Sequence, residues 1–185
     1  LSDVELRDVP GVGTLEAFNT DGVRTLRLTL PMPFMKEKTM RYPGHANLMR
    51  ILRESGFFSP SPIVVDGQQV APLSVTSKLL FGQWLLQPGD EDITVMQVVV
   101  DGQKGDRRLR YTYDLFDEYD RATQTHSMAR TTGYTCAIVA RQVGRGLFTR
   151  KGICPPEYIG GDAACYADLL AGYARRGIHL RETIT

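Results

Sequence analysis

The chain has 185 residues, which is long enough for one compact domain with a hydrophobic core. Its composition of 42% hydrophobic and 23% charged residues is typical of a globular protein and excludes the disordered and fibrous classes. The formal net charge of +1 argues against nucleic-acid and anionic-membrane partners, because both require a concentrated basic face. The longest apolar runs, such as 93–100, are far shorter than the ~20 residues needed to cross a bilayer. We therefore expect a single soluble domain over residues 1–185, with no membrane partner.

The three cysteines, Cys136, Cys154 and Cys165, are an odd number whose spacing matches neither a zinc ribbon nor a redox CxxC pair. We expect reduced thiols of a cytoplasmic protein and no metal site. The chain begins at Leu1 without a targeting leader, so we expect it to be a fragment of a longer protein.

The first half of the chain predicts two strands followed by two helices. A short apolar alternation after a glycine-rich turn predicts a strand over 14–19, and a second strand is expected over 37–42. Apolar residues at helical spacing predict a helix over 45–55, which Gly56 would end as a C-cap residue. A similar apolar stripe predicts a second helix over 74–86.

The second half predicts a β-hairpin, two helices and a final strand. The apolar run 93–100 and the alternating run 109–115 flank turn sequences, so they are expected to pair as an antiparallel hairpin. The first of these strands is expected to be central in its sheet and the second to be half exposed. Helices are expected over 127–144 and 162–177, and a strand over 178–183. Together the elements predict an α+β fold with a mixed, mostly antiparallel sheet, helices packed on one face and no Rossmann fold.

No segment has the glycine-rich turn that binds the pyrophosphate of a dinucleotide. The only candidate is Gly11-Val12-Gly13, where Glu16 occupies the position of the third glycine and its carboxylate would repel phosphate. We interpret this segment as a turn before a strand. Sequence patterns for P-loop, zinc-protease, EF-hand and serine-hydrolase sites are also missing. We therefore expect no cofactor-binding residue in this chain.

Two turn regions, 19–24 and 36–45, combine charged and hydroxyl side chains. Binding residues collect in such turns because a rigid scaffold can aim them. Arg24 and Arg41 are candidates for a two-pronged, charge-assisted contact with a substrate carboxylate. The alternative is that both arginines are solvated or paired with acidic neighbours. Those neighbours are Glu16, Asp21 and Glu37.

His45 follows Pro43-Gly44 at the expected start of a helix, where the positive end of the helix dipole favours a neutral imidazole. It is the one candidate for a catalytic base, and the alternative is a capping-region residue without chemistry. In the segment 127–134, Thr132 and Gly133 interrupt a helical pattern and could let a ligand approach the backbone closely. The alternative for Gly133 is tight packing of the helix against the sheet.

Five segments, in this order and spacing, resemble the C-terminal domain of the saccharopine dehydrogenase family. The segments are Leu15–Gly22, Lys38–His45, Val75–Leu80, Tyr113–Asp117 and Ser127–Tyr134. The resemblance extends from about Gly13 to Ile178. It is stronger for the bacterial saccharopine-dehydrogenase-like proteins, which include lysine 6-dehydrogenase, than for the fungal saccharopine reductases.

The resemblance implies a two-domain enzyme in which an N-terminal Rossmann domain, absent from this chain, binds NAD or NADP. The present domain would then close the substrate cleft and form a homodimer through its sheet. The implied reaction is hydride transfer between the nicotinamide and a carbon bearing nitrogen, in lysine or a lysine-derived amino acid. Because such substrates carry carboxylates, the resemblance favours the carboxylate-binding role of Arg24 and Arg41. The full set of substrate-binding candidates is Asp21, Arg24, Thr39, Arg41, Thr132 and Gly133.

Two departures from the family pattern leave the substrate open. Gly22 stands where the fungal reductases have serine, and Thr135 stands near a position where many members have proline. The exact amino acid, the choice between NAD and NADP and the direction of the reaction do not follow from the sequence. The competing hypothesis is a family member that has lost catalysis and serves as an interaction or scaffold module.

Overall fold

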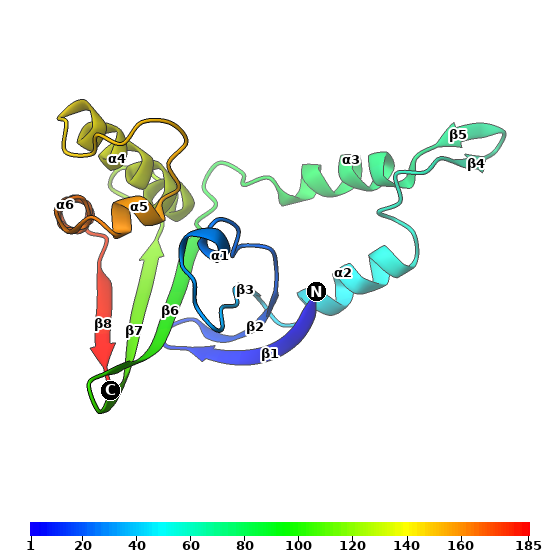
Figure 1. Cartoon of the computed structure of the whole chain (residues 1–185). Helices are drawn as coiled ribbons and strands as arrows, with labels where there is room; N and C mark the ends of the chain where they lie inside the picture. The colour runs from blue at the N-terminus through cyan, green and yellow to red at the C-terminus, as the bar shows by residue number, and fades with distance from the viewer. The chain divides into compact units, whose positions relative to one another are not determined.

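The computed structural model describes residues 1–185, which form two compact units, Leu1–Gln87 and Pro88–Thr185 (Figure 1). Both units contain helices and strands, and all strand pairs are antiparallel. The α+β class and the lack of a parallel Rossmann sheet are therefore confirmed. The strands are divided among three sheets, where the sequence predicted one.

The first unit contains a three-stranded sheet, a small hairpin and three helices. Its elements are β1 (Ser2–Val9), β2 (Gly13–Asn19), α1 (Leu26–Thr29), β3 (Lys38–Arg41), α2 (His45–Glu54), β4 (Ile63–Val65), β5 (Gln68–Val70) and α3 (Pro72–Trp84). The sheet has the order β1-β2-β3, and β4 pairs with β5. The predicted strands correspond to β2 and β3, and the predicted helices correspond to α2 and α3.

The sequence did not predict β1, because acidic residues are uncommon in strands. In the structure, the acidic residues of β1 lie against a lysine of β3. The Lys38 Nζ lies 2.9 Å from Asp3 Oδ2 and 3.2 Å from Glu5 Oε1. Hydrogen bonds from Lys38 lower the pKa of both carboxyl groups. The acidic residues that disfavour a strand by local propensity therefore link β1 to β3 through Lys38.

The second unit contains a three-stranded sheet and a group of helices. Its elements are β6 (Ile93–Lys104), β7 (Arg107–Glu118), the π-helical turn η1 (Ala129–Gly133), α4 (Tyr134–Gly144), α5 (Glu157–Gly160), α6 (Ala163–Ala174) and β8 (Leu180–Ile184). The predicted hairpin is confirmed as β6 and β7, which pair from Ile93 opposite Glu118 to Lys104 opposite Arg107. The predicted final strand is confirmed as β8.

The sheet order β6-β7-β8 corrects the predicted positions of the two hairpin strands. We expected the apolar run 93–100 to be the central strand, but β7 lies at the centre and β6 lies at an edge. An apolar strand is typical both of the middle of a sheet and of an edge that another surface covers. The sequence pattern alone does not separate these two cases.

The helices α4 and α6 pack closely in the second unit (Figure 1). A methyl group added at Gly172 of α6 would lie 2.7 Å from the Ile138 Cδ1 of α4, so glycine permits this close approach. Ile138, Cys165 and Gly172 are buried. The side chain of Asp162 caps α6 by accepting a hydrogen bond from the Cys165 N–H at 2.9 Å. None of the helices is long and apolar enough to span a membrane.

Candidate functional site

One face of the β2–β3 pair carries several of the predicted site residues. Phe18 lies opposite Thr39, and Glu16 lies opposite Arg41. Directly opposed residues of antiparallel strands project to the same side of a sheet, and residues two apart on one strand share that side. We call these four residues the β2–β3 face. It brings together the predicted residues Thr39 and Arg41.

The start of α2 is held over this face by a buried carboxylate. Glu16 is only 6% exposed. Its Oε2 accepts a hydrogen bond from the Gly44 N–H at 3.0 Å, and its Oε1 accepts one from the Ala46 N–H at 2.5 Å. These N–H groups belong to the first turn of the helix, where no backbone acceptor is available. Glu16 therefore caps the N-terminus of α2, as an N-cap side chain does in other helices.

The His45 ring stacks on Phe18 with a centroid distance of 5.9 Å and an interplanar angle of 5°. This contact brings the imidazole, predicted as a candidate base, to the same face as Thr39 and Arg41. The sequence did not identify Glu16 as the residue that orients it. A single acidic residue within an apolar alternation gives no signal that its carboxylate is buried.

Glu37 anchors the turn that carries Asp21 and Arg24. Its carboxylate accepts hydrogen bonds from the Thr20 hydroxyl, from the Gly22 N–H at 3.0 Å and from the Thr39 hydroxyl at 3.3 Å. A side chain at Gly22 would begin 2.6 Å from the Glu37 Cδ. A serine at this position, as in the fungal reductases, would therefore require the Glu37 side chain to move.

The two arginines form no ion pair with the acidic residues that surround them in the sequence. Arg41 is exposed, and its Nη1 donates a 2.7 Å hydrogen bond to the Met40 carbonyl. Arg24 is exposed and has a φ of 40°, in the left-handed region that non-glycine residues seldom adopt. Asp21 is exposed in the same turn. Backbone N–H groups and threonine hydroxyls occupy the carboxylates of Glu16 and Glu37. Of the alternatives that the sequence left open, solvation of the two exposed arginines therefore stands beside the substrate contact.

The predicted residues Thr132 and Gly133 lie in the second unit, in the π-helical turn η1. Three threonine hydroxyls donate to the carbonyl four residues earlier: Thr131 to Ser127 at 2.9 Å, Thr135 to Thr131 at 2.5 Å, and Thr132 to Met128. Such bonds compete with the backbone ladder and bend helices. Single π-helical turns occur frequently at functional sites.

The packing alternative for Gly133 is wrong. A methyl group added there would meet no atom within 4 Å, so the glycine does not permit a close helix contact. Gly133 is exposed, and the approach of a ligand to its backbone stays a prediction. Thr132 is also exposed, although its hydroxyl hydrogen is donated to Met128.

A buried ion pair fixes η1 to the end of β7. The Arg130 Nη2 donates to Asp117 Oδ1 at 3.0 Å, and the Ser127 hydroxyl donates to Asp117 Oδ2 at 2.8 Å. Arg130 also donates from Nη1 to Asp120 at 3.0 Å. The hydrogen bond to Asp117 raises the pKa of Arg130 above its usual value. Arg130, Asp117 and Ser127 are buried, and their contacts hold the turn in place.

The candidate residues therefore form two separate groups, one in each unit. In the first unit, Thr39, Arg41 and His45 share the β2–β3 face, and Asp21 and Arg24 lie on the turn held by Glu37. Together they offer a guanidinium, a hydroxyl and an imidazole, which suit a polar ligand with a carboxylate. In the second unit, Thr132 and Gly133 expose a π-helical turn. No group of three or more histidine, cysteine, aspartate or glutamate side chains is arranged to hold a metal ion.

Comparison with known families matches residues 2–178 to the model of the saccharopine dehydrogenase C-terminal domain. The match covers nearly the whole chain and crosses the boundary between the two units at Gln87. It includes both groups of candidate residues. The chain therefore belongs to the saccharopine dehydrogenase C-terminal domain family.

Proposed function

We propose that this chain is the substrate-binding and dimerisation part of an NAD(P)-dependent oxidoreductase. The enzyme would act on the C–N bond of lysine or of a lysine-derived amino acid, converting an amine to an imine or the reverse. We place it among the bacterial members that include lysine 6-dehydrogenase, and we regard the two units as parts of one family domain, 1–185. The observation that carries the proposal concerns Arg41. Its guanidinium is exposed, pairs with no carboxylate of the chain, and lies on the same face as Thr39 and His45.

In this proposal Arg41 binds the substrate carboxylate and fixes the direction of the amino acid. A guanidinium donates two parallel hydrogen bonds to a carboxylate, which adds orientation to the charge attraction. Arg24, on the turn held by Glu37, is the second candidate for this contact, with Asp21 and Thr39 as polar neighbours. His45 is the proposed proton acceptor, because its ring is held by stacking on Phe18 and faces the same side.

The cofactor, NAD or NADP, is proposed to bind outside this chain. Gly11 and Gly13 have φ values of 80° and 100° and lie in the turn between β1 and β2, where no helix follows. A dinucleotide cradle needs a strand, a glycine-rich turn and then a helix N-terminus. The residues present do not fit the pyrophosphate, so this chain supplies substrate contacts and no cofactor contact.

A homodimer is proposed through the edge strand β6, whose apolar residues include the half-exposed Met96, Val98 and Val100. The apolar run 93–100 lies within this 12-residue edge strand, and an unpaired edge is a ready surface for pairing with another strand. The three cysteines are free, which suits the reducing environment of the cytoplasm that we propose as its location.

A second candidate function is a non-catalytic interaction module of the same family. It is favoured by the apolar surface of α3, where Leu79, Phe81 and Trp84 are all more than half exposed. Large exposed apolar patches mark protein–protein contacts. Kinetics of the full-length protein separate the two candidates, since an interaction module has no turnover that depends on Arg41.

The test uses the full-length enzyme with Arg41 or Arg24 replaced by lysine or alanine. Losing a charge-assisted contact costs about 1.5–3 kcal/mol, so kcat/KM should fall roughly ten- to a hundredfold for at least one arginine. Lysine should restore little, because it lacks the planar fork. The control is Arg53→Ala, an exposed arginine in the last turn of α2, which should retain wild-type kinetics. Normal kinetics in both alanine variants, with a lowered thermal midpoint, would contradict the substrate role.

A further inference from the structure

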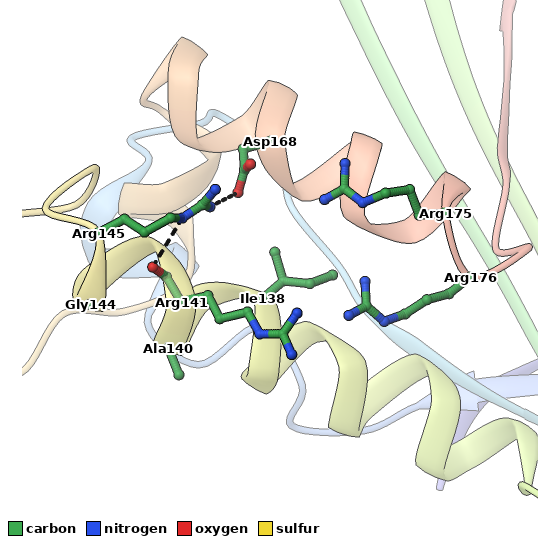
Figure 2. Close-up of a pocket in the computed structure, with 8 residues that line it drawn as sticks. All are labelled: Ile138, Ala140, Arg141, Gly144, Arg145, Asp168, Arg175 and Arg176. Atoms are coloured by element: carbon green, nitrogen blue, oxygen red, sulfur yellow. Dashed lines mark hydrogen bonds and ion pairs between the residues drawn. The ribbon is translucent and has the colours of Figure 1, made fainter.

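A cavity of about 500 Å³ lies between α4 and α6, within the second unit (Figure 2). Four of its lining residues are arginines and only one is acidic. The arginines are Arg141, Arg145, Arg175 and Arg176, and the acidic residue is Asp168. The cavity is formed by the C-terminal halves of the two helices. It is therefore separate from Thr132 and Gly133, which precede the first residue of α4.

One arginine is already neutralised within the cavity wall. The Arg145 Nη2 donates to Asp168 Oδ2 at 2.6 Å, and the Arg145 Nε donates to the Arg141 carbonyl at 3.2 Å. The Arg145 guanidinium, followed by the Gln142 amide, lowers the pKa of the Asp168 carboxyl group. Asp168 is thus ionised at neutral pH, and its charge is matched by Arg145.

The other three arginines have no carboxylate among them. Figure 2 shows the guanidinium groups of Arg141, Arg175 and Arg176 pointing into the space around Ile138, with Arg145 and Asp168 on its other side. Arg176 is oriented by a 2.8 Å hydrogen bond from Nη1 to the Gly172 carbonyl and by the Tyr134 ring, 5.2 Å away. The guanidinium groups of Arg141 and Arg175 form neither a hydrogen bond nor an ion pair within the chain.

Helix dipoles explain part of this arrangement but not all of it. Cations are favourable at helix C-termini, and Arg145 and Arg176 donate there to backbone carbonyls. The dipole does not account for the guanidinium groups of Arg141 and Arg175, which are exposed and line the same cavity without a hydrogen-bond partner. An anionic ligand would supply that partner.

We propose that this cavity binds a phosphorylated small molecule. Three converging guanidinium groups exceed the charge that one carboxylate neutralises, whereas a phosphate carries up to two charges and several acceptor oxygens for two-pronged arginine contacts. A volume of about 500 Å³ is typical of small-molecule sites, and Ile138 and Ala140 supply apolar surface beside the cations. The proposal does not depend on the oxidoreductase function, because it uses none of the residues assigned to the amino-acid substrate.

The test is calorimetric titration of the full-length protein with inorganic pyrophosphate, and with citrate as a carboxylate anion of similar charge. Pyrophosphate should bind more tightly than citrate, with an affinity that falls as salt is raised. Each of Arg141→Gln and Arg175→Gln should weaken it roughly tenfold or more. The thermal midpoint should change little, because neither guanidinium group forms a hydrogen bond or an ion pair in the chain. The matched control is Arg108→Gln, an exposed arginine of β7 outside the cavity.

Asp168→Asn provides a second, opposite readout. Removing this charge frees Arg145 for the ligand, so pyrophosphate should bind more tightly than to the wild type. A purely structural role for the arginines predicts no such gain. The proposal is overturned if the Arg141→Gln and Arg175→Gln variants bind pyrophosphate as the wild type does, if wild-type protein binds none, or if citrate binds more tightly.

Discussion

At the scale of single residues, buried carboxylates determine where the candidate site lies. Glu16 stands in an otherwise apolar strand, yet both of its oxygens accept backbone hydrogen bonds from the start of α2. Asp117 is likewise buried at the end of β7 and binds Arg130 and Ser127. A buried charge is tolerated when hydrogen bonds replace its hydration. Each of these carboxylates therefore fixes one group of candidate residues.

We predict that Glu16→Gln destabilises the protein by about 1–3 kcal/mol, because an amide nitrogen cannot accept the hydrogen bond that one carboxylate oxygen accepts. The first turn of α2 should loosen, and the Ala46 amide should exchange its hydrogen faster. Urea unfolding and hydrogen exchange measure the two effects. The control is Glu54→Gln at the exposed end of the same helix, where the ion pair with Arg53 is 3.7 Å long and contributes little. Equal behaviour of the two variants would refute the capping role of Glu16.

At the scale of elements, the edge position of β6 has the clearest consequence. Its partner β7 bonds to it on one side, and no strand of its sheet pairs with the other side. Natural proteins protect such edges with charges, bulges or a covering surface. Residues 93–100 of β6 contain no charged side chain, so a covering surface is the expected protection.

We predict that Val98→Lys in the full-length protein converts a dimer to a monomer. A lysine at the middle of the edge would be desolvated if a second β6 paired with it, and edge lysines block such pairing. The change is measured by light scattering during size-exclusion chromatography. Gln103→Lys, near the β6–β7 turn, is the control and should leave the mass unchanged. A wild-type protein with a monomer mass, or a Val98→Lys variant that stays dimeric, would contradict a dimer through β6.

Most regular elements could be predicted from the sequence, because periodicity and turn residues report local structure. The helix predicted over 45–55 is α2, and the hairpin predicted from 93–100 and 109–115 is β6 and β7. Which side of each helix is buried was less predictable. In α4, for example, the apolar residues Cys136 and Val143 are exposed, whereas Ile138 and the polar Gln142 are buried.

The candidate residues Thr39, Arg41 and His45 come from the sequence and from the family resemblance, but their arrangement does not. Their common face depends on the register of β2 with β3 and on hydrogen bonds from Gly44 and Ala46 to Glu16. These are contacts between residues more than 15 positions apart, and a local pattern carries no information about them.

At the scale of the whole molecule, one family model spans both units and includes both groups of candidate residues. The β2–β3 face supplies the unpaired Arg41, and η1 supplies an exposed backbone in a π-helical turn. Neither unit has the glycine-rich turn and following helix that a dinucleotide requires. In the function that we propose, this chain holds the amino acid and another part of the enzyme holds the cofactor.

The central claim is that the full-length protein oxidises or reduces a C–N bond of a lysine-type amino acid with a nicotinamide cofactor. The most direct measurement follows the absorbance of reduced nicotinamide while the protein is incubated with lysine and with lysine-derived amino acids. Each is tested with NAD and NADP in both directions. We predict cofactor turnover with at least one of these substrates, and a roughly ten- to a hundredfold lower kcat/KM when the arginine that binds its carboxylate is replaced by alanine. No turnover with any substrate, from a protein that is folded and binds the cofactor, would contradict the claim and favour the non-catalytic interaction module.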